Sequence, residues 1–218
     1  MAAAGKKETL RRLEIIKRLD FAYPGTAREL CALRFKTPFQ LLVATILSAQ
    51  CTDERVNATT PKLFERYGTP LEMVEASPAE LEKLIYSTGF YKNKARNILA
   101  LSSVLLSDYC GEVPDSMEEL SALPGVGRKT ANVVLSVVFS KPGLPVDTHV
   151  LRLALRLGLT TEKDPVKVER DLMLWVPSDE AGAFSLRLIL HGRNVCLARK
   201  PRCNICVLAD ICPSATIA

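Results

Sequence analysis

The chain has 218 residues, and 48% of them are hydrophobic, which is enough to bury the core of one large domain or two small ones. Lys and Arg exceed Asp and Glu by 29 to 24, and the resulting net charge of +5 permits a polyanionic partner without requiring one. No apolar run is long enough to span a bilayer, and the N-terminus lacks the apolar core of a secretory signal. The sequence therefore predicts a folded cytoplasmic protein.

Helix signals begin at the N-terminus and recur along the chain. Residues 1–20 carry an amphipathic stripe, whereas residues 39–50 (FQLLVATILSAQ) are too apolar for a surface helix and predict a buried one. The stripe consists of Leu10, Leu13, Ile16 and Leu19. Ser77 begins a helix that Gly89 ends, and Asp164 begins another that runs to Trp175. Because alternating strand patterns are absent, the predicted fold class is all-α.

A glycine-bearing turn lies between two helical segments at residues 123–132 (LPGVGRKTAN). The glycines needed for a P-loop or for a dinucleotide-binding fingerprint are missing, so neither motif is present. Ser116 with Glu119 resembles a capping box at the start of the first helix, and Pro124 ends that helix. The turn predicts a helix, a tight hairpin and a second helix, whose first N–H groups can bind an anion such as a phosphate.

A composition break follows at residues 141–147 (KPGLPVD), where two prolines and a glycine mark a candidate domain boundary. The last residue of this break, Asp147, stands before an apolar helical segment and has the position of an N-cap.

Four of the seven cysteines are grouped near the C-terminus with the spacing Cys-x6-Cys-x2-Cys-x5-Cys. They are Cys196, Cys203, Cys206 and Cys212. In a cytoplasmic protein such a group indicates a metal centre rather than disulfides, and the spacing alone leaves open zinc or a four-iron cluster. The loop between the first two cysteines carries three cations that are suited to a phosphate backbone, or else form a solvated charged loop: Arg199, Lys200 and Arg202.

Taken together, these motifs resemble bacterial endonuclease III. The resemblance rests on LLVATILSAQCTDERVN (41–57), GFYKNKARNI (89–98), GEVP (111–114), LPGVGRKTANVV (123–134), VDTH (146–149), ILHGR (189–193) and the cysteine spacing, in that order. It implies two helical domains flanking a DNA-binding cleft. Residues 31–141 would form a six-helix barrel with the helix-hairpin-helix, and residues 1–30 plus 142–218 would form a domain with a [4Fe–4S] cluster.

The function that the resemblance implies is base excision repair. A bifunctional DNA glycosylase and abasic-site lyase would remove oxidised pyrimidines from duplex DNA and cleave the strand 3′ to the abasic site by β-elimination. Lys129 matches the family's nucleophile, which forms a Schiff base and must be neutral to attack. The positive end of the helix, Arg128 and partial burial are expected to favour the neutral amine. Asp147 matches the family's catalytic aspartate, with a pure capping role as the alternative.

The resemblance also implies positions that contact DNA. In the hairpin these are Gly125, Val126, Gly127, Arg128 and Thr130. Gln50 and Phe90 match residues that enter the duplex, although Phe90 replaces the leucine common in the family and would otherwise be a core aromatic. Asp53 and His149 match positions near the damaged-base pocket, with a satisfied polar role as the alternative, and His191 is predicted to be structural.

The expected partner is double-stranded DNA containing damaged pyrimidines or abasic sites, bound by a monomer without any membrane association. Three rival functions remain: a related adenine glycosylase, a DNA-binding module without catalysis, and an iron–sulfur electron carrier. The adenine glycosylases have another residue in place of Lys129, docking alone needs neither Lys129 nor Asp147, and electron transfer leaves the hairpin unexplained.

Overall fold

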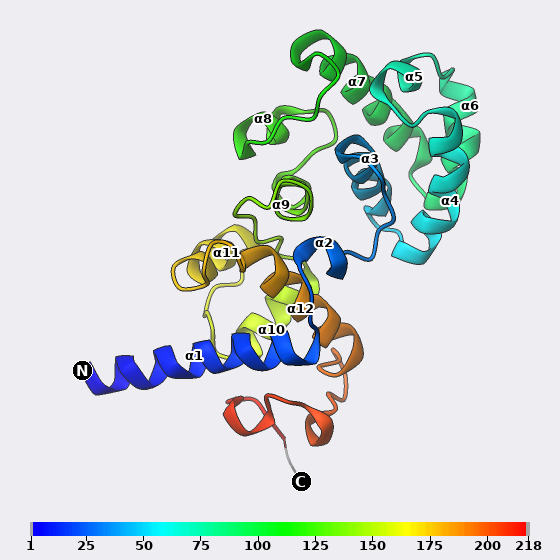
Figure 1. The fold of residues 1–218 in the computed structure, drawn as a ribbon. Coiled ribbons are helices and arrows are strands. Elements are labelled where there is room, and N and C mark those ends of the chain that lie inside the picture. The colour runs from blue at the N-terminus through cyan, green and yellow to red at the C-terminus, as the bar shows by residue number, and fades with distance from the viewer. Residues whose placement is uncertain (1, 217–218) are drawn as a thin grey trace. The chain divides into compact units, whose positions relative to one another are not determined.

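The structure is a computed structural model that describes residues 2–216, and in that range every regular element is a helix (Figure 1). This confirms the all-α prediction. None of the described helices is long and apolar enough to cross a membrane. The α-helices are α1 (Ala2–Ala22), α2 (Ala27–Leu30), α3 (Pro38–Ser48), α4 (Asp53–Arg66), α5 (Pro70–Val74), α6 (Pro78–Ile85), α7 (Tyr91–Tyr109), α8 (Met117–Ala122), α9 (Arg128–Val137), α10 (Thr148–Arg156), α11 (Pro165–Met173) and α12 (Ala181–Asn194); short 3-10 turns are η1 (Tyr86–Thr88), η2 (Cys203–Ile205) and η3 (Ala209–Ile211).

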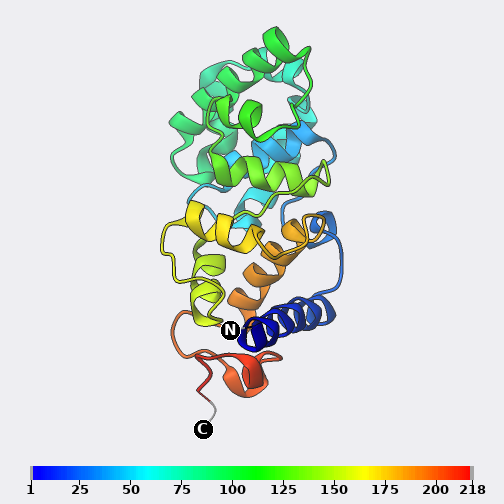
Figure 2. The ribbon, with the colours of Figure 1, turned by 90° about the vertical axis from the view of Figure 1, so that its left-hand side faces the viewer.

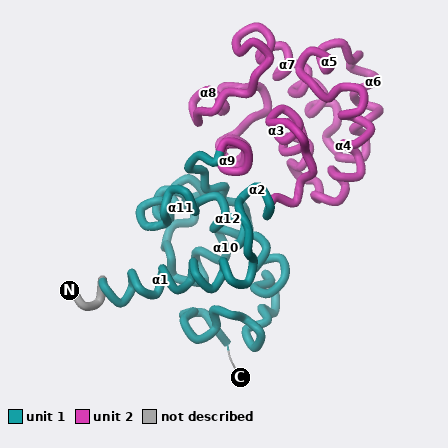
Figure 3. Tube along the Cα trace, viewed as in Figure 1, with its two compact units in different colours: residues 1–30, 140–218 teal, residues 31–139 magenta. Residues whose placement is uncertain are grey.

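The chain divides into two compact units (Figure 3). The inserted unit contains residues 31–139, and the terminal unit combines residues 1–30 with 140–218. The chain thus leaves the terminal unit after α2, builds the inserted unit with α3 to α9, and returns before α10.

Helix α3 forms the centre of the inserted unit. Its residues 39–47 are all buried, and it packs against α4, α7 and α9. Thr37 caps the helix by accepting a hydrogen bond from the amide of Gln40, and Pro38 occupies its first turn. The prediction of a buried helix is confirmed, and the helix ends at Ser48, two residues before the end of the predicted segment.

The predicted helix starts are confirmed. Ser77 accepts a hydrogen bond from the amide of Glu80 at the start of α6, and Asp164 accepts two from the first turn of α11. Helix α11 ends at Met173, however, and not at Trp175. The following Pro177 disfavours helical backbone just before it. The Trp175 ring instead packs edge-on against Phe184, with the ring centres 5.7 Å apart.

Helices α1, α10 and α12 build the core of the terminal unit. Helix α12 packs against α1, α2 and α10, and the largest buried side chains include Ile15, Leu19 and Phe184. The predicted stripe on α1 is wrong in its first half, because Leu10 and Leu13 are 60% and 50% exposed. Figure 1 shows the reason: the first turns of α1 extend past the other helices of this unit, so only its later turns contact the core.

The C-terminal segment after α12 lies beside α1, as Figures 1 and 2 both show. Two arginines of α1 make this contact. Arg11 Nη1 donates to the carbonyl of Ile211 at 3.4 Å, and Arg18 Nη1 donates to that of Val207 at 3.0 Å. Arg11 Nη1 also donates to the carbonyl of Leu157, at the end of α10, at 2.8 Å. Hydrogen bonds from α1 therefore hold the C-terminal segment that contains the cysteines.

Candidate functional site

The predicted hairpin lies between α8 and α9 in the inserted unit. Ser116 caps α8 by accepting the amide of Glu119 at 3.2 Å, and its own hydroxyl donates to the Glu119 carboxylate at 2.6 Å. The glutamate thus bonds the capping hydroxyl in a variant of the predicted capping box. Leu123 and Val126 are buried, and the Val126 amide donates to the carbonyl of Leu123 at 3.1 Å. The apolar residues of the turn therefore anchor it and leave its glycines outside.

The two hairpin glycines are needed for different reasons. Gly125 has a φ of +77°, and a Cβ there would lie 2.9 Å from the Cβ of Asn97, so both the backbone and the packing require glycine. Gly127, the N-cap of α9, has a φ of −94° and open space where a Cβ would point. Neither its conformation nor its protein neighbours exclude a side chain.

Lys129 is the second residue of α9, and its side chain is exposed. The expectation of partial burial is therefore wrong: Lys129 lies in the first turn of α9, before the buried positions that begin at Ala131. In the described part of the chain its amine makes no hydrogen bond or ion pair. The start of α9 also has no side-chain cap, since Gly127 cannot supply one. Arg128 is exposed and Thr130 is half-buried beside it.

Gln50 and Phe90 share an unusual backbone conformation. Both have left-handed backbone, with φ of 55° and 49°, which is rare for residues other than glycine. Both side chains are exposed, and Phe90 is 64% accessible. The alternative interpretation of Phe90 as a core aromatic is therefore wrong. The sequence did not signal this conformation, because the adjacent Gly89 looked like the residue that would adopt it, and it too has positive φ.

Asp53 is the first residue of α4 and is half-buried, directly after the N-cap Thr52. A carboxylate in this first turn interacts favourably with the helix dipole. Stabilisation of the first turn of α4 is therefore enough to explain an aspartate at this position.

In the terminal unit, Asp147 caps α10. Its Oδ1 accepts hydrogen bonds from the amides of His149 and Val150, at 2.8 and 2.9 Å. Among the residues that the structure describes, Oδ2 has no hydrogen-bond partner, and the side chain is half-buried. The chain segment just before Asp147 is fixed by Ser185 of α12, whose buried hydroxyl donates to the carbonyl of Pro145 at 2.6 Å. One carboxylate oxygen is therefore used by the fold, and the other is available.

His149 contacts Arg152 one turn later on α10, with Nδ1 and Nη2 3.1 Å apart. The same guanidinium nitrogen donates to the carbonyls of Gly192 and Cys196. A Cβ at Gly192 would lie 3.0 Å from His149, so α10 and α12 pack closely at this point. His149 is half-buried in this network, which gives it a structural role besides the predicted one.

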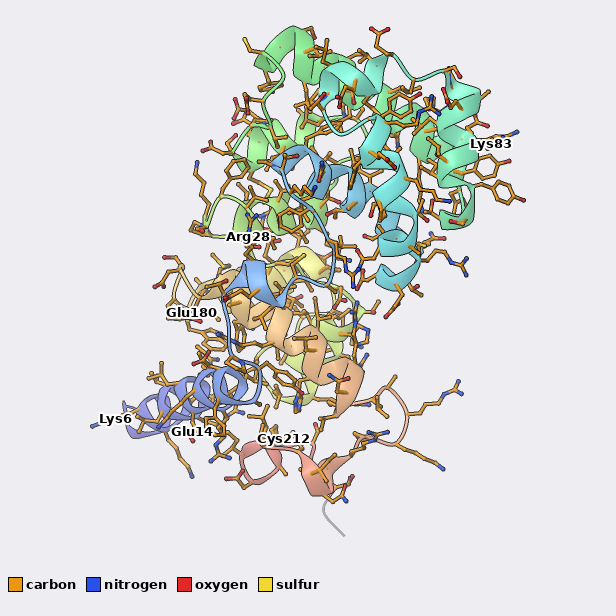
Figure 4. The ribbon with its side chains drawn as sticks, turned by 45° about the vertical axis from the view of Figure 1, so that its right-hand side comes forward. Lys6, Glu14, Arg28, Lys83, Glu180 and Cys212 are labelled. Atoms are coloured by element: carbon orange, nitrogen blue, oxygen red, sulfur yellow. The ribbon has the colours of Figure 1, made fainter. Side chains whose placement is uncertain are left out.

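The four C-terminal cysteines line one cavity of the terminal unit, together with His191 and Arg156 (Figure 4 labels Cys212). None of the four is in a disulfide. Within residues 2–216, no group of three or more His, Cys, Asp or Glu side chains is placed to hold a single metal ion. Burial raises the pKa of the Cys206 and Cys212 thiols, and thiolates there therefore need a positive centre to be stable. These residues fit an iron–sulfur cluster.

His191 is buried between Tyr23 and the cysteines. Its Nδ1 lies 3.2 Å from the Tyr23 hydroxyl, and its Nε2 lies 3.2 Å from Cys206 Sγ. Burial lowers the pKa of His191 to about 4, which keeps the ring neutral near pH 7. A neutral ring carries one N–H, so it can donate to one of these two partners and accept from the other, and a thiolate at Cys206 would be the acceptor. His191 therefore orients a cysteine, in agreement with its predicted structural role.

The cationic loop after Cys196 is held by Arg156, which the sequence analysis did not single out. Its guanidinium donates to Cys196 Sγ at 3.3 Å and to the carbonyls of Leu197 and Ala198 at 2.7 and 2.8 Å. The sequence did contain a pattern that pointed to this residue: Arg152 and Arg156 are four residues apart, which places them on the same face of one helix. The three loop cations are all exposed, and Lys200 has left-handed backbone with a φ of 53°.

Comparison with known proteins agrees with this geometry. Residues 43–178 match a family model described as HhH-GPD superfamily base excision DNA repair protein, and residues 196–212 match the iron–sulfur binding domain of endonuclease III. The chain is 53% identical to endonuclease III of Synechocystis over 97% of its length and 95% of the relative's. It is 44% identical to that of Escherichia coli, over 93% of its length and 94% of the relative's.

Two solved structures show the same similarity. One is a non-covalent endonuclease III–DNA complex, with a TM-score of 0.88 and 42% identity, which covers 94% of this chain and 95% of that one. The other is a trapped endonuclease III–DNA covalent intermediate, with a TM-score of 0.87, 42% identity and coverage of 94% and 96%. The chain therefore belongs to the endonuclease III family, and it is a DNA glycosylase and abasic-site lyase of base excision repair with a [4Fe–4S] cluster.

Proposed function

We propose that Lys129 is the nucleophile of this enzyme and that its substrates are oxidised pyrimidines and abasic sites in double-stranded DNA. The observation that supports this most directly is the environment of the amine. It is exposed at the uncapped start of α9 and, among the described residues, engaged in no hydrogen bond or ion pair. A lysine needed only for folding would be expected to contact its neighbours.

The proposed reaction begins when the neutral Lys129 amine attacks C1′ of the damaged nucleotide. The new N–C1′ bond displaces the base, which leaves with a proton, and the opened sugar becomes a Schiff base. Loss of a proton from C2′ then breaks the C3′–O bond, which cleaves the strand 3′ to the lesion. Water hydrolyses the imine and frees the lysine.

We assign to Asp147 the electrostatic and proton-transfer part of this reaction. Its Oδ1 is committed to the first turn of α10, whereas Oδ2 is available to the substrate. A carboxylate stabilises positive charge that develops at C1′ and exchanges protons with the amine. The capping bonds hold the carboxylate in one orientation, so capping and catalysis support each other.

DNA would be bound by the hairpin from Gly125 to Thr130 and by the loop cations Arg199, Lys200 and Arg202. The open position at Gly127 leaves room for a phosphate against the backbone. Gln50 and Phe90 would fill the space in the duplex that the extruded base leaves, because both are exposed on strained turns. Asp53 and His149 would line the pocket of the extruded base.

The four C-terminal cysteines would ligate the cluster, which organises the segment that carries the cationic loop. Residues 31–141 would act as the helix-hairpin-helix barrel domain, and residues 1–30 plus 142–218 as the iron–sulfur domain. We further propose that the protein acts as a monomer on the DNA of the bacterial nucleoid in the cytoplasm.

The test is borohydride trapping on a duplex that contains one thymine glycol. Borohydride reduces the Schiff base to a stable covalent adduct, which we expect for the native protein and not for Lys129→Ala. A matched control is Lys92→Ala, since Lys92 is also an exposed second residue of a helix that follows a glycine-bearing turn. This variant should give the adduct at the native level.

Two other results would change the proposal in different ways. An adduct that persists in Lys129→Ala would show that another amine is the nucleophile. Trapping on a preformed abasic site but not on thymine glycol would leave the lysine chemistry in place and exclude this class of oxidised base.

A further inference from the structure

Lys94 of α7 is a buried lysine in the inserted unit. Only 5% of it is exposed, and burial lowers its pKa. Its Nζ donates to two main-chain carbonyls, those of Leu47 and Thr88, each at 2.8 Å. Burying an ammonium group is costly, and an apolar residue of similar volume would often stabilise a core better. Stabilisation of the core therefore does not explain why a lysine is buried at this position.

Each of the two carbonyls lies just before one of the exposed left-handed residues. Leu47 is in the last turn of α3, three residues before Gln50, and Thr88 ends η1, two residues before Phe90. In a continuing helix the amide of Cys51 would donate to the carbonyl of Leu47, but here it donates to the carbonyl of Ser48. The carbonyl of Leu47 is therefore available to Lys94. One ammonium group thus joins the ends of two elements that are far apart in sequence.

Left-handed backbone at residues other than glycine costs about 1–3 kcal/mol each and persists only where the surroundings enforce it. Among the described residues, the Gln50 side chain makes no hydrogen bond that would do so, and a phenylalanine side chain has no group that could make one. The bonds from Lys94 hold the main chain three residues before Gln50 and two residues before Phe90. They therefore restrict both turns at once.

We propose that Lys94 is a positioning residue that presents Gln50 and Phe90 to the duplex as one rigid pair. This inference rests on the proposed entry of these two residues into DNA. Without the ammonium group, the two turns would relax independently, and filling the space left by the extruded base would require ordering them again. Lys94 would then increase the rate of base extrusion without touching the substrate.

The test is a set of double-mutant cycles that combine Lys94→Met with Phe90→Ala and with Gln50→Ala. Met keeps the apolar volume of the lysine and removes its donors. Single-turnover excision of thymine glycol and the fluorescence of 2-aminopurine opposite the lesion are measured at a temperature where all variants are folded. The destabilised control is Leu105→Ala, which removes a fully buried side chain from the same helix.

We expect Lys94→Met to slow excision roughly tenfold, with a smaller 2-aminopurine signal, as for other displaced positioning groups. Because Lys94 would act through the pair, its effect should shrink to about twofold or less when Phe90 or Gln50 is already Ala. Leu105→Ala should change neither readout. Cleavage of an abasic site in single-stranded DNA, where there is no duplex to open, should be unaffected by Lys94→Met. If Lys94→Met does not fold, Lys94→Gln takes its place, because Gln keeps an N–H donor on a shorter side chain. Slower excision by Lys94→Gln that shrinks when Phe90 or Gln50 is already Ala supports the proposal, and excision at the native rate refutes it.

The failures of the two proposals can be distinguished. If Phe90→Ala and Gln50→Ala slow excision but Lys94→Met behaves like Leu105→Ala, or adds its full effect in the double variants, only the role of Lys94 is refuted. If Phe90→Ala and Gln50→Ala both excise at the native rate, the proposed entry into DNA is wrong and the inference fails with it.

Discussion

Asp147 combines a folding role with a proposed catalytic one in a single side chain. The sequence indicated both roles, and the structure divides them between the two oxygens: Oδ1 accepts the amides of His149 and Val150, whereas Oδ2 lacks a partner among the described residues. The two roles can be separated experimentally, because Asn is as good an N-cap as Asp but carries no charge.

We expect Asp147→Asn to change the free energy of unfolding by no more than about 0.5 kcal/mol, since the amide oxygen preserves the cap. Excision in single turnovers should nevertheless fall by about 100-fold or more, because the charge that assists proton transfer is lost. Asp147→Ala should show the same loss of rate and a further cost of about 1 kcal/mol in stability. Native activity of Asp147→Asn would reduce Asp147 to a cap.

At the scale of elements, the hairpin between α8 and α9 was largely predictable, because caps, prolines and glycines act over a few residues. The sequence predicted the turn, the start of α8 and an exposed helix N-terminus, all of which are present. It could not separate the two glycines, since their difference depends on Asn97 of α7, a neighbour distant in sequence.

The two glycines should respond differently to alanine. Gly127→Ala should change the free energy of unfolding by less than about 1 kcal/mol, because its φ and its surroundings both accept a Cβ. Its DNA affinity should fall, since the methyl group would occupy the space of the phosphate. Gly125→Ala should lose about 1–3 kcal/mol of stability from its positive φ alone. Chemical denaturation and equilibrium DNA binding measure the two effects, and native affinity of Gly127→Ala would exclude a phosphate at this position.

At the scale of the whole molecule, the terminal unit is built from both ends of the chain. Arg11 and Arg18 of α1 hold the segment around η3, and Arg156 of α10 holds the cationic loop. As far as residue 216, the cysteine segment has only short 3-10 turns of its own. Its order therefore depends on contacts with the rest of the unit, which include these arginines and the burial of Leu208 in the core, and on the cluster.

Removing iron with an oxidant and a chelator should expose the segment from Cys196 onward to hydrogen exchange and proteolysis, because its main internal link is lost. The inserted unit, residues 31–139, should keep its protection. DNA affinity should fall roughly tenfold or more as the loop cations lose their fixed positions. Borohydride trapping at saturating DNA should persist, since the cluster performs no step of the proposed chemistry. Loss of trapping under those conditions would contradict a purely structural role.

The sequence by itself determined the features that depend on near neighbours: the helical class, the caps, the hairpin and the grouping of four cysteines. Tertiary structure decided where side chains lie when the decisive neighbour is far along the chain. It placed α1 against the C-terminal segment, exposed Leu10, Leu13, Phe90 and Lys129, and buried Lys94 against the carbonyls of two separate elements. Capping and turn formation are local energies that a short segment expresses alone, whereas burial is a property of the packed chain.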